Sequence, residues 1–168
     1  WEIADTIKGE TEAIIWPIFI YISLKDFISV GSVAFIVGLG SVAFTLFVGQ
    51  YYDKKNKLFL MKLGGILYLL VWVVRIFVDT RVPLYVISLA AGFLAIMMNI
   101  PFNAIFYDRT EKIKDVGGFI ATREIPSFIG RALLWIVLIF VADKFTVAFA
   151  LAGLASLFFL FFRFSKLK

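Results

Sequence analysis

The chain has 168 residues, of which 62% are hydrophobic and only 17% are charged, and its mean hydropathy is +0.97. Soluble domains carry charge on about a quarter of their residues, so this composition excludes an ordinary soluble protein. The absence of cysteine excludes disulfides and thiolate metal sites. Histidine is also absent, so any proton exchange near neutral pH must use Asp or Glu.

Long apolar runs predict six membrane-spanning helices. A bilayer core about 30 Å thick needs about 20 apolar residues for each helical crossing, so six crossings use most of the chain. We therefore expect an all-α membrane protein with a single transmembrane domain over residues 1–168. The predicted helices lie near residues 4–24, 28–51, 58–78, 83–106, 116–141 and 144–162.

The connecting segments alternate in positive charge. One set, which includes the tail, is rich in Lys and Arg, and the other set has one basic residue in each connection. By the positive-inside rule the basic set is cytoplasmic, which predicts a multi-pass protein of the cell's inner (plasma) membrane with both termini in the cytoplasm. The net charge of +5 therefore indicates topology, and no nucleic acid partner is expected. The basic set holds Lys54, Lys55, Lys57, Arg109, Lys112, Lys114, Arg163, Lys166 and Lys168, and the other set holds Lys25, Arg81 and Lys144.

The first predicted helix is unusual because its apolar part, residues 13–24, is too short to cross the bilayer core. The crossing therefore has to include the charged residues that precede it. Charges at that depth are tolerated where they face protein or a water-filled cavity, so we expect this helix to line a polar interior. The alternative is that residues 1–12 form an amphipathic segment at the membrane interface. The polar face is predicted to hold Asp5, Lys8 and Glu12 and to continue through Trp16 and Phe19.

The second run has small residues spaced by three and four. Such a stripe lets another helix backbone approach closely, so it predicts a helix-packing face without identifying the partner. The stripe consists of Ala34, Gly38, Ser41, Thr45 and Gly49.

A motif follows this run directly, in the segment Gly-Gln-Tyr-Tyr-Asp-Lys-Lys-Asn-Lys that starts at Gly49. It resembles the signature loop between the second and third helices of the major facilitator superfamily, whose usual pattern is Gly-x-x-x-Asp-Arg/Lys-x-Gly-Arg/Lys. Asn56 stands where the family usually has Gly, and Asn tolerates the left-handed turn conformation better than most residues. The alternative is an ordinary basic loop. The matching residues are Gly49, Asp53, Lys54 and Lys57.

The resemblance implies one major-facilitator-type six-helix bundle made of two inverted three-helix repeats. Family members usually have twelve helices in two such bundles, so the chain is either a fragment of a longer transporter or half of a homodimer. The resemblance also implies that the first and fourth helices line the central cavity. In a homodimer the second helix of one copy would meet the fifth helix of the other. The arginine that many proton-coupled members carry in the fourth helix is missing here.

Independent sequence features point to the same two helices. Pro17 interrupts the first run and Pro101 the fourth, and paired interruptions of this kind indicate a binding site. Asn99 and Asn103 lie one turn apart on one face, where they would bind hydroxyl, amide or carboxyl groups, or else neighbouring helices. We predict that Trp16, Phe19, Asn99 and Asn103 bind the solute.

The fifth run carries charges inside an apolar stretch, together with glycines that would let it approach another helix. Arg123 lies near its cytoplasmic end and is predicted to anchor a cytoplasmic gate by pairing with Asp53 or Asp108. Arg75, near the outer end of the third run, is expected to extend toward the lipid headgroups. The glycines are Gly117, Gly118 and Gly130, and the other charged residues are Glu124 and Arg131.

These features favour a secondary active transporter of a small polar solute, with a sugar-like solute preferred, that acts by alternating access as a homodimer of six-helix halves. Carboxylates in the cavity would couple transport to protons. Glu12 is the first candidate, Asp5 and Glu124 are the alternatives, and Lys8 would modulate the proton affinity. The expected partners are the lipid bilayer, a second copy of the chain, the solute and protons.

Two other functions stay open. Within the transporter class, the chain could be a proton-driven exporter of amphipathic drugs, since aromatic-rich cavities accept such compounds. From another class, it could be a non-transporting membrane scaffold or assembly protein, with a dry interior in which the first-helix charges pair off completely. We expect neither an enzyme nor a cofactor or metal site, because the sequence has no His or Cys nucleophile–base pair, no metal-ligand cluster and no phosphate-binding glycine loop.

Overall fold

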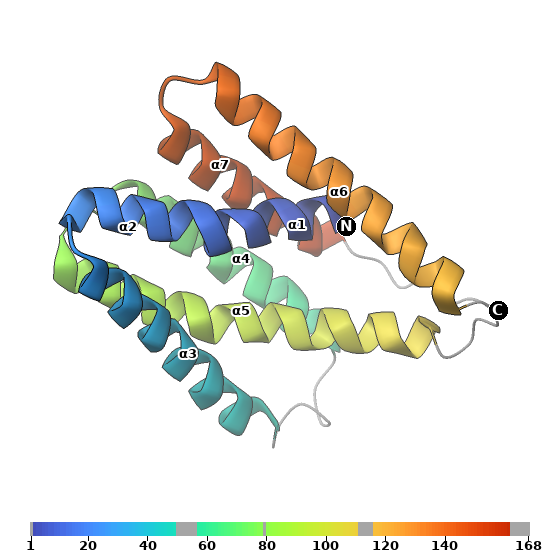
Figure 1. Cartoon of the computed structure of the whole chain (residues 1–168). Helices are drawn as coiled ribbons and strands as arrows, with labels where there is room; N and C mark the ends of the chain where they lie inside the picture. Colours follow the sequence, from blue (N-terminus) through green and yellow to red (C-terminus); the bar gives the residue numbers. More distant parts are fainter. Residues whose placement is uncertain (1, 50–56, 79, 111–115, 162–168) are drawn as a thin grey trace.

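The computed structural model describes residues 2–49, 57–78, 80–110 and 116–161, and over these residues it is built of helices joined by short turns (Figure 1). The all-α fold class is therefore confirmed. In chain order the elements are α1 (Glu2–Glu10), the π-helical turn η1 (Thr11–Ile15), α2 (Trp16–Leu24), α3 (Phe27–Gly49), α4 (Lys57–Ile76), α5 (Arg81–Thr110), α6 (Val116–Phe140), α7 (Lys144–Leu157) and the 3-10 turn η3 (Phe158–Phe161).

Four of the described helices are long and apolar enough to cross a bilayer, as expected of an integral membrane protein. Large apolar side chains on their outer faces, such as Phe35, Leu70 and Val86, are exposed in the folded chain. Lipid tolerates such a surface where water does not. The four candidate spans are Phe27–Leu46, Leu58–Ile76, Arg81–Ala104 and Lys144–Phe161. The charged helices, α1 and α6, fall outside this set.

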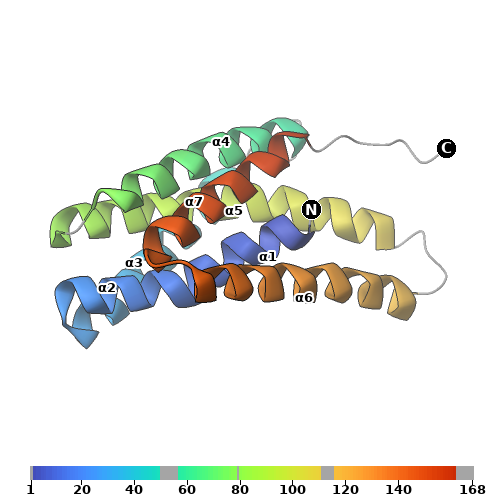
Figure 2. The same cartoon turned by 90° about the horizontal axis from the view of Figure 1, so that it is seen from above.

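The helices lie side by side and run alternately in opposite directions (Figures 1 and 2). The turns from α2 to α3, from α4 to α5 and from α6 to α7 lie at one end of the bundle, and α1 begins at the other end. The helix α1 continues through η1 into α2, so this N-terminal unit has the length of one long helix. A hydrophobic core fills the space between the helices, with Trp72, Met98 and Phe149 among its most buried members.

Two of the turns are fixed by aspartate caps. Lys25 ends α2 in the left-handed conformation, with φ of 53°, and the Asp26 carboxylate then accepts hydrogen bonds from the backbone N–H of Ile28 and the hydroxyl of Ser29. These bonds lower the pKa of Asp26. Asp143 caps α7 by accepting from the backbone N–H of Thr146 at 3.2 Å, which lowers the pKa of Asp143. Both caps therefore stabilise the fold at pH values above the ordinary aspartate pKa. This stabilisation is lost when the pH falls through the lowered pKa and the carboxylates are protonated.

The closest helix contact described is between α3 and α5, and glycine makes it possible. A Cβ on Gly92 would collide with the carbonyl oxygen of Val37, and one on Gly40 would collide with that of Leu89. Ser41 adds a hydrogen bond from its hydroxyl to the carbonyl oxygen of Gly92 at 3.1 Å. Small residues thus bring these two backbones together as they do in other membrane helix pairs.

The predicted small-residue stripe coincides with this contact only at Ser41. Ala34, Gly38 and Thr45 are exposed on the neighbouring face of α3, because the edge that packs on α5 is shifted by one residue position, to Val37 and Gly40. Spacing alone could not distinguish the two edges, since small residues occupy both. The exposed part of the stripe remains a prediction about contact with another chain.

The glycine contact gives a direct test. We expect Gly92→Ala to lower the thermal unfolding temperature in detergent, because the new methyl group forces α3 away from α5, at a cost of about 1–3 kcal/mol. Gly31→Ala in α3 is the matched control, since nothing lies within 4 Å of its added Cβ. An equal unfolding temperature for the two variants would contradict the observed contact.

Candidate functional site

A buried ion pair joins the first helical unit to α4. Both carboxylate oxygens of Glu12 accept hydrogen bonds from the guanidinium group of Arg75, and the Nη2–Oε1 distance is 2.9 Å. The hydroxyl of Tyr68 donates a third hydrogen bond to Glu12, also at 2.9 Å. Arg75 is fully buried, whereas the Glu12 side chain is 23% exposed. This bidentate, charge-assisted geometry is the strong form of an ion pair.

Two indole rings enclose the guanidinium group. The Cζ atom of Arg75 lies 4.0 Å from the ring centroid of Trp16 and 4.4 Å from that of Trp72. Cation–π contacts of this kind stabilise a desolvated cation. The predicted orientation of Arg75 toward the headgroups is therefore wrong, because Glu12 and the two rings together satisfy its charge inside the bundle.

The local helix geometry places Glu12 at this point. Pro17 has no backbone N–H to donate, and just before it the N–H of Trp16 bonds to the carbonyl of Thr11, five residues back, instead of four. The resulting π turn, Thr11–Ile15, contains Glu12. Such single π turns occur frequently at functional sites.

A second polar contact joins α1 to α5. The amino group of Lys8 lies 2.9 Å from the Asp5 carboxylate and donates a hydrogen bond to Oδ1 of Asn99 at 3.2 Å. It also lies 5.1 Å from the ring centroid of Phe159. Lys8 is buried, so these contacts replace its water shell. Asp5, Lys8 and Glu12 therefore all point toward protein groups.

The residues predicted to bind solute are not gathered in one place. Trp16 stacks on Phe19, with ring centroids 5.6 Å apart, and both rings pack against Phe149 on α7. Asn99 forms the helix-to-helix contact with Lys8, which is the alternative that the sequence left open for it. Asn103 is half-buried one turn further along α5.

An open polar groove of about 410 Å³ lies between α1 and α6. Two ion pairs cross it: Arg123 Nε lies 3.0 Å from Glu2 Oε2, and Arg131 Nε lies 2.6 Å from Glu10 Oε1. Four carboxylates and two guanidinium groups line the groove, which gives it a formal charge of −2. The lining residues are Glu2, Asp5, Thr6, Gly9, Glu10, Arg123, Glu124, Ser127 and Arg131.

The backbones of α1 and α6 lie close together beside the groove. A Cβ on Gly130 would lie 2.8 Å from the carbonyl oxygen of Ile3, so α6 approaches α1 closely at this point. The expectation for Gly130 is confirmed. Gly117 and Gly118 are exposed.

The gate prediction is not tested by the described residues. Arg123 pairs with Glu2, and Asp53 and the side chain of Asp108 lie outside the described residues, so the predicted pairs with them stay predictions. The same holds for the loop motif: Gly49 ends α3 and Lys57 begins α4, while Asp53 and Lys54 lie outside the described part of the chain.

The sequence analysis did not identify Arg75, Tyr68, Glu2 or Glu10 as site residues. A signal was available for Arg75: a carboxylate within a membrane span requires a cation, and few cations lie at matching depth in the apolar runs. No comparable signal identifies Tyr68, because a tyrosine in an apolar run is equally consistent with core packing.

Comparison with known proteins gives no match: no protein-family model matches the chain, and neither does any curated protein or solved structure.

The buried ion pair predicts a specific mutational pattern. Arg75→Met should destabilise the protein by about 3–5 kcal/mol, because it leaves the Glu12 charge without a partner. Adding Glu12→Gln to that variant removes the unpaired charge and should restore much of the loss. The measurement is chemical or thermal unfolding of both variants in the same detergent.

The matched control is Arg131→Met. Arg131 is 53% exposed and Glu10 is 14% exposed, so loss of this pair should cost clearly less than loss of the pair with the fully buried Arg75. If Arg75→Met were as mild as Arg131→Met, or if the double variant were as unstable as the single one, Glu12 and Arg75 would not be coupled as the geometry requires.

Proposed function

We propose that the chain is one half of a secondary active transporter of the major facilitator type, acting by alternating access as a homodimer and coupling a small polar solute to protons. The groove between α1 and α6 carries the proposal. Six ionisable side chains line this open groove on a bundle whose other outer surfaces are largely apolar. Lipid does not tolerate such a surface, so the groove has to face water or another protein.

The pattern of helix contacts supports two inverted repeats. With α1, η1 and α2 taken as the first span and α7 with η3 as the sixth, the main contacts join spans one and five, two and four, three and four, one and six, and three and six. If spans one, two and three are exchanged with spans four, five and six respectively, every contact in this set becomes another contact of the set. The smaller contacts across the turns, α2 with α3 and α6 with α7, fall outside it. Since successive spans alternate in direction, repeats related in this way are inverted, as in this superfamily.

The glycine contacts follow the same exchange. Gly40 in the second span lies against the backbone of the fourth, and Gly130 in the fifth lies against the backbone of the first. Two equivalent close approaches are what a repeated three-helix unit would produce. The family resemblance of the loop motif adds to this support.

The buried pair supplies a means of proton coupling. A proton and the guanidinium group of Arg75 compete for the same Glu12 carboxylate. Protonation of Glu12 would therefore weaken the link between the first span and α4. The contact from Lys8 to Asn99 joins the first and fourth spans, the two that the resemblance assigns to the cavity. Protonation would thus change how the cavity-lining helices are held.

One observation favours the second candidate, a non-transporting scaffold or assembly protein. Each charged side chain described in the first span has an oppositely charged partner: Glu2 with Arg123, Asp5 with Lys8, Glu10 with Arg131 and Glu12 with Arg75. Complete pairing is what a scaffold requires. The pairs at Glu2 and Glu10, however, line an open groove and are not sealed in a dry interior.

Transport in liposomes distinguishes the two candidates. Purified protein under an imposed pH gradient should accumulate at least one solute from a panel of radiolabelled sugars, amino acids and cationic drugs. Glu12→Gln leaves Arg75 without its carboxylate, so only correctly folded variant protein is reconstituted. In that protein, gradient-driven accumulation should fall to the level of protein-free liposomes while solute exchange stays intact, because the variant cannot exchange a proton. Asp26→Asn, in the exposed turn before α3, is the control and should behave like the parent chain.

Two results would contradict the proposal. If no solute of the panel moves through correctly folded protein, the scaffold function is favoured. If Glu12→Gln transports with unaltered coupling, Glu12 is not the proton site, and Asp5 and Glu124 become the candidates to test.

The homodimer has its own test, since the chain has no cysteine. Gly38→Cys in α3 and Ile125→Cys in α6, placed in one chain, should cross-link two copies in native membranes, because the proposal brings these exposed helix faces together across the two-fold axis. Ile66→Cys, at an exposed position of α4, is the control and should give no dimer. Dimers from the control alone would place the interface elsewhere.

A further inference from the structure

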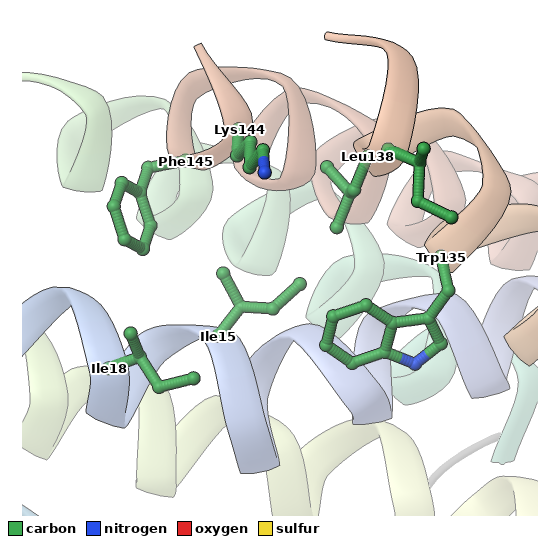
Figure 3. Close-up of a pocket in the computed structure, with 7 residues that line it drawn as sticks. Ile15, Ile18, Trp135, Leu138, Lys144 and Phe145 are labelled. Atoms are coloured by element: carbon green, nitrogen blue, oxygen red, sulfur yellow. The ribbon is translucent and has the colours of Figure 1, made fainter. Parts of the chain in front are cut away.

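An apolar groove lies at the end of the bundle where α6 turns into α7. It has a volume of about 220 Å³ and is walled by the first helical unit, the last part of α6 and the start of α7 (Figure 3). Its lining is mainly apolar, Trp135 contributes an indole ring, and Lys144 is the charged residue among the lining residues. The lining residues are Ile15, Ile18, Trp135, Leu138, Ile139, Lys144 and Phe145.

Lys144 has no ionic partner among the described residues. The neighbouring carboxylate of Asp143 accepts from the N–H of Thr146 as the helix cap. Figure 3 shows the Lys144 amino group at the edge of the groove, between Phe145 and Leu138 and above Ile15. The groove therefore combines an apolar wall with one uncompensated positive charge.

A second apolar groove, of about 230 Å³, lies next to the first. Its lining is Pro17, Ile18, Tyr21, Phe27 and Val30, so Ile18 forms a wall of both grooves. The two grooves thus flank α2 at the same end of the bundle. Two apolar channels separated by one side chain suit a molecule with two hydrocarbon chains.

We propose that these paired grooves bind a diacyl phospholipid with an anionic headgroup. One acyl chain lies in each groove, on either side of Ile18, and the Lys144 amino group binds the headgroup phosphate. The location agrees with this ligand, because Lys144 begins a candidate membrane span and so lies near the level of the headgroups. A lysine beside apolar walls at this level attracts an anionic headgroup by its charge. The inference needs only a bilayer around the helices and is independent of transport.

The role of the Lys144 charge can be tested by native mass spectrometry of the full chain. The protein is mixed in detergent with phosphatidylglycerol or with phosphatidylcholine of equal chain length, and the lipid that stays bound after the detergent is removed is measured. We expect phosphatidylglycerol to remain bound preferentially. Lys144→Gln should weaken its binding about fivefold, as expected for one basic residue at a membrane surface, and Lys144→Arg should retain it. Lys25→Gln, which removes another exposed cation at the same end of the bundle, is the matched control. Equal retention of the two lipids, or equal losses in the two Gln variants, would overturn the proposal.

The two chains can be tested separately. Lysophosphatidylglycerol has the same headgroup and one acyl chain, so it should bind more weakly than the diacyl lipid. Ile18→Trp should reduce diacyl binding by filling both grooves, whereas Ile66→Trp, a similarly exposed isoleucine on α4, should not. Equal binding of the one-chain and two-chain lipids to the parent chain would rule out the paired-groove site.

Discussion

The ion pair between Glu12 and Arg75 is the contact on which the arrangement of the first helical unit depends. It fixes a charged segment with a π-helical turn against α4, where Arg75 is fully buried and the Glu12 side chain is 23% exposed. Trp16 and Trp72 shield the guanidinium group, and Tyr68 completes the hydrogen bonding of the carboxylate. Loss of either partner leaves an unpaired charge among apolar side chains, so substitutions at Glu12 or Arg75 alone should destabilise the fold.

Two different kinds of helix contact build the rest. The apolar helices α3 and α5 are joined by glycine, through close backbone approach and dispersion. The charged helices α1 and α6 combine a glycine approach at Gly130 with ion pairs along the same seam. In the proposed arrangement of two inverted repeats, these two seams would be equivalent. The ion pairs thus lie on the α1–α6 seam, whereas the α3–α5 seam has the single Ser41 hydroxyl as its described side-chain hydrogen-bond donor.

Much of the fold could be predicted from the sequence because membrane helices are long and uninterrupted apolar runs mark them directly. The candidate site was harder to predict from the sequence. That Glu12 faces inward follows from the shortness of the apolar part of the first run. Its partner Arg75 was assigned to the headgroups, because an arginine near the end of a span can either extend to the headgroups or pair with a carboxylate inside the bundle. The stripe on α3 shows the same difficulty: Gly38 and Gly40 are equally small, and only the three-dimensional structure places Gly40 against Leu89. Which residues of two distant helices touch depends on how each helix is rotated about its own axis, and the spacing of residues along one helix does not determine that rotation.

The division of the first-helix charges bears directly on function. Glu2 and Glu10 pair with arginines of α6 whose side chains are 26% and 53% exposed, so the cations of these pairs remain partly accessible from the groove. Glu12 has its partner in the core, where exchange is costly and requires a proton or a movement of α4 to compensate. A chain that needed only to hold its helices together could use apolar packing at both places, since well-packed apolar residues are often as stabilising as a buried ion pair. The same helical unit therefore carries one pair with a fully buried cation and two pairs whose cations are partly exposed. The proposed alternating access would use the first as a rigid contact and the other two as contacts that can be exchanged.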